Sequence, residues 1–232
     1  MKSLLANAKT EDMAKSEITE AMDDVQASVR PFLRELGWRS RKRAFNRITQ
    51  DGLTQVIEFQ VGRFDPPGTH YVAFRRNFYG KFTVNVGVYV PEVNQCIGFR
   101  KDERLFVHEG DCCIRQRLGP LGPEEQDVWW ELGDPPGVAA EILRRIERDA
   151  FPFFAQFESR GAILSKWTVE TGNPYTGGNP PRVVCAIILA AQGRLDEARA
   201  YLNAQARDHK NHPHFAWVCA LADKLGLGKL DL

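Results

Sequence analysis

The stretch from Phe82 to Val90 constrains the fold of this chain more than any other. Valine occupies every second position from Val84 to Val90, and the positions between are polar, small or amphipathic. Side chains of a β-strand point alternately to the two faces of a sheet, so this pattern predicts a strand with one buried face. A single strand of this kind is not stable by itself. The chain must therefore supply further strands and a layer that covers the valines.

Further strand patterns lie on both sides of this segment. Residues 45–49 and 53–61 flank Asp51-Gly52, and an Asp-Gly pair between two strands favours a tight hairpin turn. Weaker strand patterns cover residues 111–118 and 128–132. Because hairpin-linked strands pair antiparallel, we expect an antiparallel sheet of four to five strands.

Two helical patterns enclose these strands in the sequence. Apolar residues recur at intervals of three and four over residues 17–36 and again over residues 138–158, which predicts two amphipathic helices. Helices before and after a set of hairpins favour an α+β fold with helices packed on one face of the sheet. We expect both helices to cover the valine face, and a helical hairpin to follow at the C-terminus.

A Gly-, Asn- and Pro-rich stretch at residues 172–181 predicts a boundary between two parts of the chain. Beyond it, the pattern predicts three short helices, over residues 182–192, 195–209 and 214–225, docked on the main body. The expected organisation is a flexible N-terminus at 1–14, an α+β domain at 15–171, a linker at 172–181 and a helical appendage at 182–232.

The residues from Ile187 to Leu202 look like the middle of a tetratricopeptide repeat. In that repeat, a small residue lets two antiparallel helices pack closely and a glycine makes the turn, as Gly193 would here. Stacked repeats need about three copies for stability, and one is visible in this sequence. The likeness therefore implies a helical hairpin docked on its neighbours, with a peptide-binding solenoid as the alternative.

The composition is that of an ordinary globular protein, with 43% hydrophobic and 26% charged residues. No apolar run approaches the roughly 20 residues of a membrane span, and the first residues lack the apolar core of a signal peptide. The five cysteines have no regular spacing, which is typical of reduced thiols. We expect a protein of the cytoplasm with no membrane partner.

The net charge of +1 is unevenly distributed. Residues 31–118 carry +6 and residues 119–159 carry −6, which favours attraction between these regions. A basic run at residues 39–43 also lies beside Trp38 and Phe45. Basic residues next to aromatic ones can bind nucleic acid, but Lys and Arg are also common on exposed sheet edges. Nucleic-acid binding through the basic strands is therefore an alternative hypothesis.

Two clusters contain residue types that bind metals. The first is His-Glu-Gly-Asp-Cys-Cys at residues 108–113, and the second comprises His209, His212 and His214. The first lacks the second histidine of a zincin helix, and the second lacks a carboxylate or thiolate at ligand spacing. No phosphate-binding loop, dinucleotide fingerprint or nucleophile elbow occurs in the sequence. We therefore assign no catalytic residue, no metal ligand and no cofactor.

The face of the sheet opposite the valines is the candidate binding surface. Strand alternation places polar or amphipathic side chains from three strands there. They are Glu58, Gln60, Asn85, Tyr89, Arg115 and Arg117. Paired arginines can bind a carboxylate or phosphate, and amide side chains both donate and accept hydrogen bonds. A solvated face with cross-strand Glu–Arg pairs is the alternative.

Several short segments match a known family in the same order along the chain. They are residues 36–47, 56–60, 82–89, 113–115 and 129–132. These segments resemble the bacterial family called domain of unknown function 4304. With the flanking helices, the likeness covers about residues 15–165. It implies a bacterial source and a compact α+β unit, and the family brings no established activity or catalytic residue.

The missing motifs and the half-polar strands favour a non-catalytic module that binds another protein. An adaptor or toxin-neutralising role in a bacterial cytoplasm fits this hypothesis, with the C-terminal hairpin as part of the interface. One alternative is a small-ligand binder or enzyme that uses the polar sheet face. The other is nucleic-acid binding through the basic strands.

Overall fold

The structure is a computed structural model, and it describes residues 2–62, 78, 80–98, 106–123, 125–131, 133–171 and 178–231, with the backbone alone for residues 2–18. The chain forms two compact units. The first unit comprises Met1–Arg47, Ile57–Val86 and Arg117–Pro152, and the second comprises Ile48–Val56, Gly87–Gln116 and Phe153–Leu232. The expected linker at 172–181 lies mostly outside the described residues.

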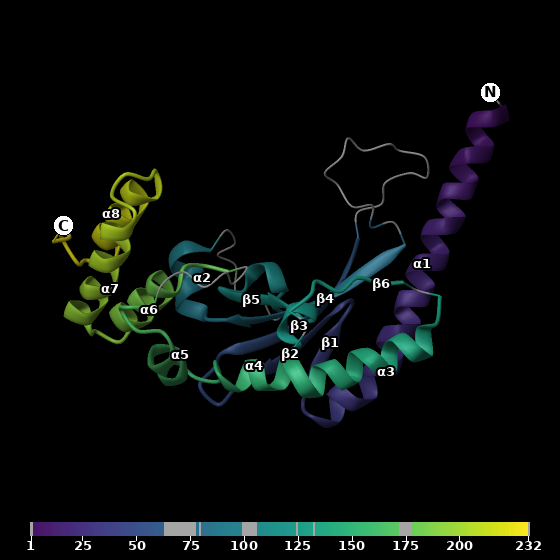
Figure 1. Cartoon of the computed structure of the whole chain (residues 1–232), viewed down its shortest axis with the longest axis horizontal. Helices are drawn as coiled ribbons and strands as arrows, with labels where there is room; N and C mark the ends of the chain where they lie inside the picture. The colour runs from purple at the N-terminus through teal and green to yellow at the C-terminus, as the bar shows by residue number, and fades with distance from the viewer. Residues whose placement is uncertain are drawn as a thin grey trace. The chain divides into compact units, whose positions relative to one another are not determined.

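A six-stranded antiparallel sheet confirms the predicted α+β fold. Five strands follow one another across the sheet in sequence order, and β6 pairs with β4 (Figure 1). The strands are β1 (Arg39–Arg41), β2 (Ala44–Ile48), β3 (Thr54–Val61), β4 (Lys81–Tyr89), β5 (Ile114–Arg117) and β6 (Trp130–Glu131). The turn between β2 and β3 is the expected Asp-Gly turn, in which the Thr49 N–H donates to the Leu53 carbonyl at 2.8 Å.

A row of aromatic rings crosses the sheet within the first unit. Ring centroids are 6.0 Å apart between Phe45 and Phe59, and 6.0 Å apart between Phe59 and Phe82. Phe82 is a further 5.8 Å from Trp130 of β6. Because side chains alternate along a strand, Phe82 shares its face of β4 with Val84. The predicted valine face is therefore a buried core.

Helices of the first unit cover this aromatic face. α1 (Lys2–Glu35) and α3 (Pro135–Arg145) pack against each other. The indole N–H of Trp130 donates to the Glu141 carboxylate of α3 at 3.1 Å. Phe32 of α1 stacks on Phe151, with ring centroids 6.2 Å apart. These contacts put the helices on the side of the sheet that the alternation of β4 predicts.

The predicted helix over residues 138–158 is not a uniform α-helix. Between α3 and α4 (Phe151–Ala155), residues Ile146–Ala150 form a π-helix. The Phe151 N–H donates to the Ile146 carbonyl, five residues earlier. Within this turn Asp149 is only 8% exposed, and Arg148 binds its carboxylate through two hydrogen bonds of 2.8 Å.

The other face of β4 is buried as well, so this strand is not half-solvated. Thr83 is 0% exposed and Asn85 is 5% exposed. The Thr83 hydroxyl donates to the Val128 carbonyl at 2.9 Å. A Cβ atom on Gly87 would lie 2.8 Å from the Cβ of Cys112, so only glycine fits at position 87. Irregular chain around Val128 and Cys112 therefore covers the polar side of β4.

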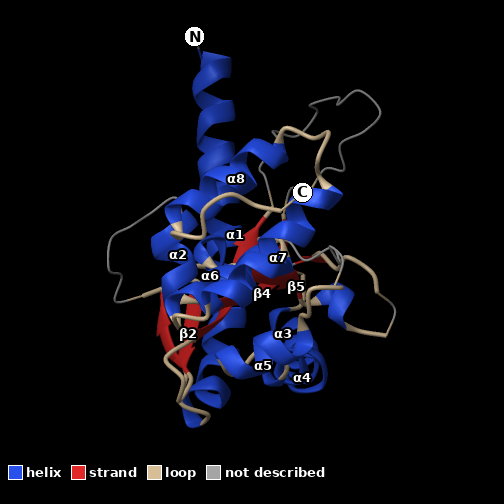
Figure 2. Cartoon of the chain, turned by 90° about the vertical axis from the view of Figure 1, so that its left-hand side faces the viewer, coloured by secondary structure: helices blue, strands red, loops and turns tan. Residues whose placement is uncertain are grey.

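The second unit contains the remaining helices, which Figure 2 colours blue. They are α2 (Pro91–Ile97), α5 (Arg160–Lys166), α6 (Pro181–Ala191), α7 (Leu195–Asp208) and α8 (His214–Lys224). α6 and α7 form the predicted hairpin, and Gly193 between them has φ +76°. α6 also packs against α2, and α8 packs against α7. The likeness of the α6–α7 hairpin to a tetratricopeptide unit stays a prediction.

The sequence patterns also miss α2, α5, β1 and the start of α1. α2 begins at Pro91, which ends β4 and is also favourable as the first residue of a helix. α5 has Ser159 as its N-cap, and β1 consists of Arg39–Arg41 without an apolar residue. α1 begins at Lys2 rather than near residue 17. No helix among the described residues has the length and apolarity needed to cross a membrane.

Candidate functional site

Two of the six predicted binding residues, Gln60 and Asn85, are in direct contact. The Asn85 amide donates to the Gln60 side-chain carbonyl at 2.7 Å. Asn85 is 5% exposed, whereas Gln60 is exposed. Glu58 is half-buried on the same strand as Gln60. The buried amide of Asn85 thus has a satisfied structural role, and Gln60 is the member of the pair that solvent reaches.

Arg117 of the first unit is held in a separate cluster. Its guanidinium binds the Asp127 carboxylate and lies 5.2 Å from the ring centre of Trp129. The Trp129 indole N–H also donates to Asp127, at 3.1 Å. Phe78 stacks on the Trp129 ring, with the ring centroids 4.1 Å apart. The side chains of Arg117 and Asp127 are 39% and 36% exposed, so this cluster lies at the surface.

Tyr89 and Arg115 belong to the second unit. Tyr89 packs on a buried cluster that contains Val107 and Cys112, and this burial raises the pKa of its hydroxyl. The Arg115 side chain is 33% exposed and lies 3.6 Å from the Glu109 carboxylate. Of the six predicted residues, the structure therefore brings Gln60 and Asn85 together, and each arginine has an acidic partner outside the set.

The two clusters with metal-binding residue types do not form metal sites in the described part of the chain. No group of three His, Cys, Asp or Glu residues there has the arrangement needed to hold a metal ion. Cys112 and Cys113 are 4% and 3% exposed. Burial raises the pKa of both thiols, that of Cys113 to about 12. Metal ligation needs the thiolate, which these environments disfavour.

The basic run at 39–43 forms a hairpin at one edge of the sheet. β1 pairs with β2 in a register that places Arg39 beside Asn46 and Arg41 beside Ala44. β1 lies at the end of the strand order, and all three of its residues are exposed. Lys42, in the turn, has φ +50°, a conformation that side chains other than glycine seldom adopt.

Exposed cations continue from this hairpin onto the end of α1, which contacts β1. We define the basic patch by five exposed residues. They are Arg30, Arg34, Arg39, Arg41 and Lys42. Among the described residues, none of the five has an ion pair or a side-chain hydrogen bond. Leu36, 42% exposed, adds an apolar side chain that lies between Arg34 and Arg39 in the sequence.

The aromatic residues beside this run are not at the surface. Trp38 is 3% exposed and Phe45 is 1% exposed. The Arg47 guanidinium lies 5.1 Å from the centre of the Trp38 ring and covers it. The interleaving of basic and aromatic residues in the sequence therefore does not produce exposed rings on which bases could stack.

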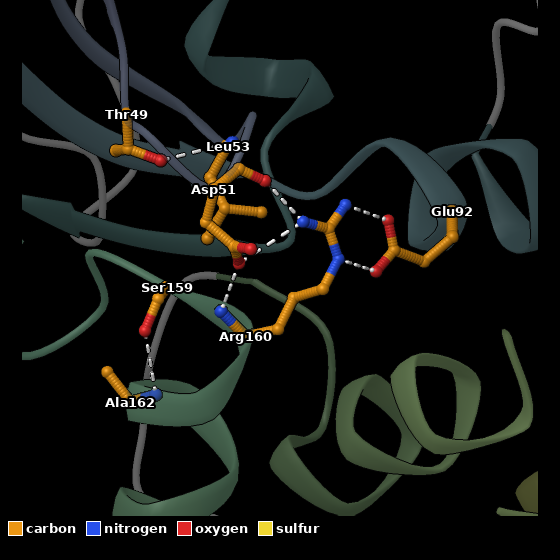
Figure 3. A network of polar contacts seen from close by, with 7 residues as sticks. All are labelled: Thr49, Asp51, Leu53, Glu92, Ser159, Arg160 and Ala162. Atoms are coloured by element: carbon orange, nitrogen blue, oxygen red, sulfur yellow. Dashed lines mark hydrogen bonds and ion pairs between the residues drawn. The ribbon is translucent and has the colours of Figure 1, made fainter. Parts of the chain in front are cut away.

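A polar network in the second unit was not predicted from the sequence (Figure 3). The Arg160 guanidinium forms two hydrogen bonds with the Glu92 carboxylate, of 2.6 and 2.8 Å. It also donates to the backbone carbonyl of Asp51, and the Arg160 backbone N–H donates to the Asp51 carboxylate at 2.6 Å. Arg160 thus joins the turn of the β2–β3 hairpin to the first turns of α2 and α5. Ser159 directly before it is an N-cap residue, and that signal could have revealed α5.

No curated protein and no solved structure matches this chain significantly. A family model matches residues 29–156, which is more than half of the chain. The matched range contains the whole basic patch and all six strands of the described sheet, while Arg160 and the C-terminal helices lie outside it. The chain therefore belongs to the family described as Domain of unknown function (DUF4304), as the resemblance of its short segments indicates.

Proposed function

We propose that this chain is a non-catalytic protein-binding module that holds an acidic partner on the basic patch. The observation that carries the proposal is the set of five exposed cations that have no acidic partner among the described residues. Elsewhere in the same unit, Arg117 and Arg148 bind Asp127 and Asp149. Cations gathered without partners repel one another, so an acidic ligand that neutralises them gains free energy.

The chemistry of the patch suits carboxylates. Each arginine presents a planar fork of N–H donors that can bind one carboxylate through two hydrogen bonds. Leu36 adds exposed apolar area between Arg34 and Arg39 in the sequence, and binding hot spots commonly combine Arg with such contacts. A protein segment rich in Asp and Glu, with an occasional apolar side chain, is the ligand that matches both features.

The conformation of Lys42 also supports a binding role for the hairpin. The left-handed region costs an L-residue about 1–2 kcal/mol, and turn positions with positive φ usually hold Gly, Asn or Asp. A lysine that keeps φ +50° at an exposed turn contributes a charge at the expense of stability. Strain of this kind is found more often at functional sites than elsewhere.

A protein partner fits the patch better than nucleic acid does. Proteins that bind single strands stack bases on exposed aromatic rings. Here Trp38 and Phe45 are buried, and Arg47 covers the Trp38 ring. The charges alone would allow contact with phosphates, so nucleic acid is tested as the competing ligand.

The polar sheet face is a second candidate, as a site for a small acidic ligand. In the first unit, Arg117 keeps 39% of its side chain exposed, and Gln60 is exposed beside Asn85. Glutamate at Gln60 tests it, because a carboxylate there still accepts the hydrogen bond from the Asn85 amide but repels an acidic ligand. Unchanged ligand binding in this variant would remove the polar face from consideration.

The main experiment reverses two charges of the patch. Arg39→Glu/Arg41→Glu is compared with the wild-type protein in binding to a fluorescein-labelled Glu-rich peptide, by anisotropy, at low and physiological salt. Losing two charge-assisted contacts, each about 1.5–3 kcal/mol, predicts at least a hundredfold weaker binding. Arg144→Glu/Arg207→Glu is the matched control, since both residues are exposed and have the same charge.

Two outcomes would overturn the proposal. One is equal binding by the patch variant and the control variant, which would place the interface elsewhere. The other is tighter binding of an oligothymidylate than of the peptide, with the salt dependence that counterion release imposes. Capture from the source organism followed by mass spectrometry then identifies the natural partner, with the patch variant as the negative bait. A role as an adaptor or toxin-neutralising protein of a bacterial cytoplasm would fit such a partner.

A further inference from the structure

The outer face of α8 is apolar although solvent reaches it. Every residue from Phe215 to Ala222 is uncharged. The inner face of this helix is buried, with Val218 and Leu221 at most 4% exposed, and α8 packs on α7. The outer face consists of exposed alanines and of Trp217, which is 39% exposed. A helix at the surface normally has a polar outer face, and one that is apolar all round is normally buried.

One line of exposed residues along α8 is symmetric about Val218. It consists of Pro213, Ala216, Ala220 and Asp223, at intervals of three, four and three residues. Residues at these intervals lie on one face of an α-helix, and we call this line the α8 seam. Two antiparallel α8 helices related by a two-fold axis at Val218 place Ala216 of one copy opposite Ala220 of the other. The same pairing places Asp223 of each copy opposite Pro213 of the other.

The two ends of the α8 seam have complementary charges. Pro213 is the N-cap residue of α8, so the positive end of the helix dipole lies there, and the exposed cation Lys210 is close by in the sequence. Asp223 supplies a carboxylate at the other end. Among the described residues, neither Asp223 nor Lys210 has an ion pair. An antiparallel pair of helices brings opposite charges together at both ends, whereas a parallel pair brings like charges together.

We infer that α8 is a dimerisation helix, which binds α8 of a second copy of this chain in antiparallel orientation. The small side chains of Ala216 and Ala220 let the two helix axes approach closely. Beside them, Trp217 supplies the large apolar area that is typical of a binding hot spot. His214 stacks on the Trp217 ring, with centroids 4.9 Å apart. Because this ring is already held in place, it loses little conformational freedom on binding.

The dimer is reversible. Each copy contributes one helix of 11 residues, which is small for a permanent interface. Its formation does not depend on the basic patch, because that patch belongs to the first unit. The second unit therefore has an interaction surface of its own, with a second copy of the chain as its partner.

Sedimentation equilibrium of the full-length protein tests the dimer. An interface of this size predicts a dissociation constant of about 1–100 μM, so the protein is studied from below to above that range. Ala220→Glu places an unpaired carboxylate at the centre of the seam twice, and it should weaken dimerisation at least about tenfold. Leu195→Glu is the matched control. Leu195 is 41% exposed on α7, and this variant should dimerise as the wild type does.

A charge swap tests the antiparallel orientation. Asp223→Lys brings a cation to the positive end of the partner helix, at both ends of the seam, and should weaken dimerisation about tenfold. His212→Asp/Asp223→Lys should recover most of this loss, because the new carboxylate attracts the new cation of the other copy. Aspartate at position 212 also accepts the His214 backbone N–H, as His212 Nδ1 does at 3.1 Å, so α8 keeps its cap.

Three results would overturn the inference. One is a wild-type protein that stays monomeric over the whole concentration range. Another is equal dimerisation of Ala220→Glu and Leu195→Glu, which would place the interface away from α8. The third is a charge swap that recovers nothing. If Ala220→Glu fails to fold, as circular dichroism would show, the swap decides, because positions 212 and 223 are both exposed.

Discussion

Replacing Arg160 with alanine should destabilise the protein by about 2–4 kcal/mol, because hydrogen bonds to charged groups contribute about 1.5–3 kcal/mol and the exposed ion pair adds less. The guanidinium binds both oxygens of Glu92 and the Asp51 carbonyl, and it lies 3.2 Å from the Asp51 carboxylate. The side chains of Arg160 and Glu92 are only 23% and 16% exposed, so water replaces these bonds poorly when one partner is removed. Arg160→Lys should lose less, because an ammonium reaches one carboxylate oxygen at a time.

The assay is urea unfolding followed by circular dichroism, for the wild type and each variant. A cycle of Arg160→Ala, Glu92→Ala and the double variant isolates the energy of the pair from the cost of the individual truncations. Arg194→Ala is the matched control. Arg194 binds Glu197 with the same two-bond geometry, at 2.7 and 2.6 Å, but the two side chains are 45% and 57% exposed. Its loss should therefore be much smaller.

Two results would refute this reasoning. A loss for Arg160→Ala no greater than that for Arg194→Ala would mean that burial does not strengthen the pair. A coupling energy near zero in the cycle would mean that Arg160 acts through packing of its aliphatic stem and not through Glu92.

The remaining predictions concern a turn, a close contact and the thiols. Lys42→Gly should relieve the strain at φ +50° and stabilise the fold by up to about 1 kcal/mol in urea unfolding, yet weaken binding of the Glu-rich peptide; a loss of stability would show that the turn is unstrained. Gly178→Ala would place a Cβ 2.0 Å from the Cys113 carbonyl oxygen, so its melting temperature should drop well below that of Gly110→Ala, where nothing lies within 4 Å. With pKa values of about 12, Cys113 and Cys185 should stay unreactive to a thiol reagent at neutral pH, and rapid labelling of either would contradict their burial. The thiols expected to react are those of the half-buried Cys96 and Cys219.

The sequence predicts the sheet well because its strands have a clear period. The alternation of valines in β4 and the Asp-Gly turn each depend on local residues, and both are confirmed. The burial of Thr83 and Asn85 is not predictable in this way. It depends on the irregular chain around Val128, which accepts a hydrogen bond from Thr83 although it lies 45 residues later in the sequence. No local pattern predicts that contact.

The candidate site shows the same division. The basic run at 39–43 is obvious in the sequence, but its pairing as β1 is not, because Arg-Ser-Arg has no apolar residue and is held by its bonds to β2. Whether Trp38 is an exposed ring or a core residue depends on Arg47, which covers it from β2. The prediction of a binding surface on the polar sheet face stays untested. The side chains there have structural partners, which the sequence alone does not show.

The π-helix at Ile146–Ala150 has a consequence for relatives of this chain. One π turn holds one residue more than the α-helix would, and each residue of an α-helix turns the chain by about 100°. Removing one residue of the π turn would make the Phe151 N–H donate to the carbonyl four residues earlier, as in a regular α-helix. Phe151 would then stay on the side of the helix where it stacks on Phe32. A family member with a one-residue gap in this segment should therefore keep an aromatic pair at the positions of Phe32 and Phe151, as should a member without a gap.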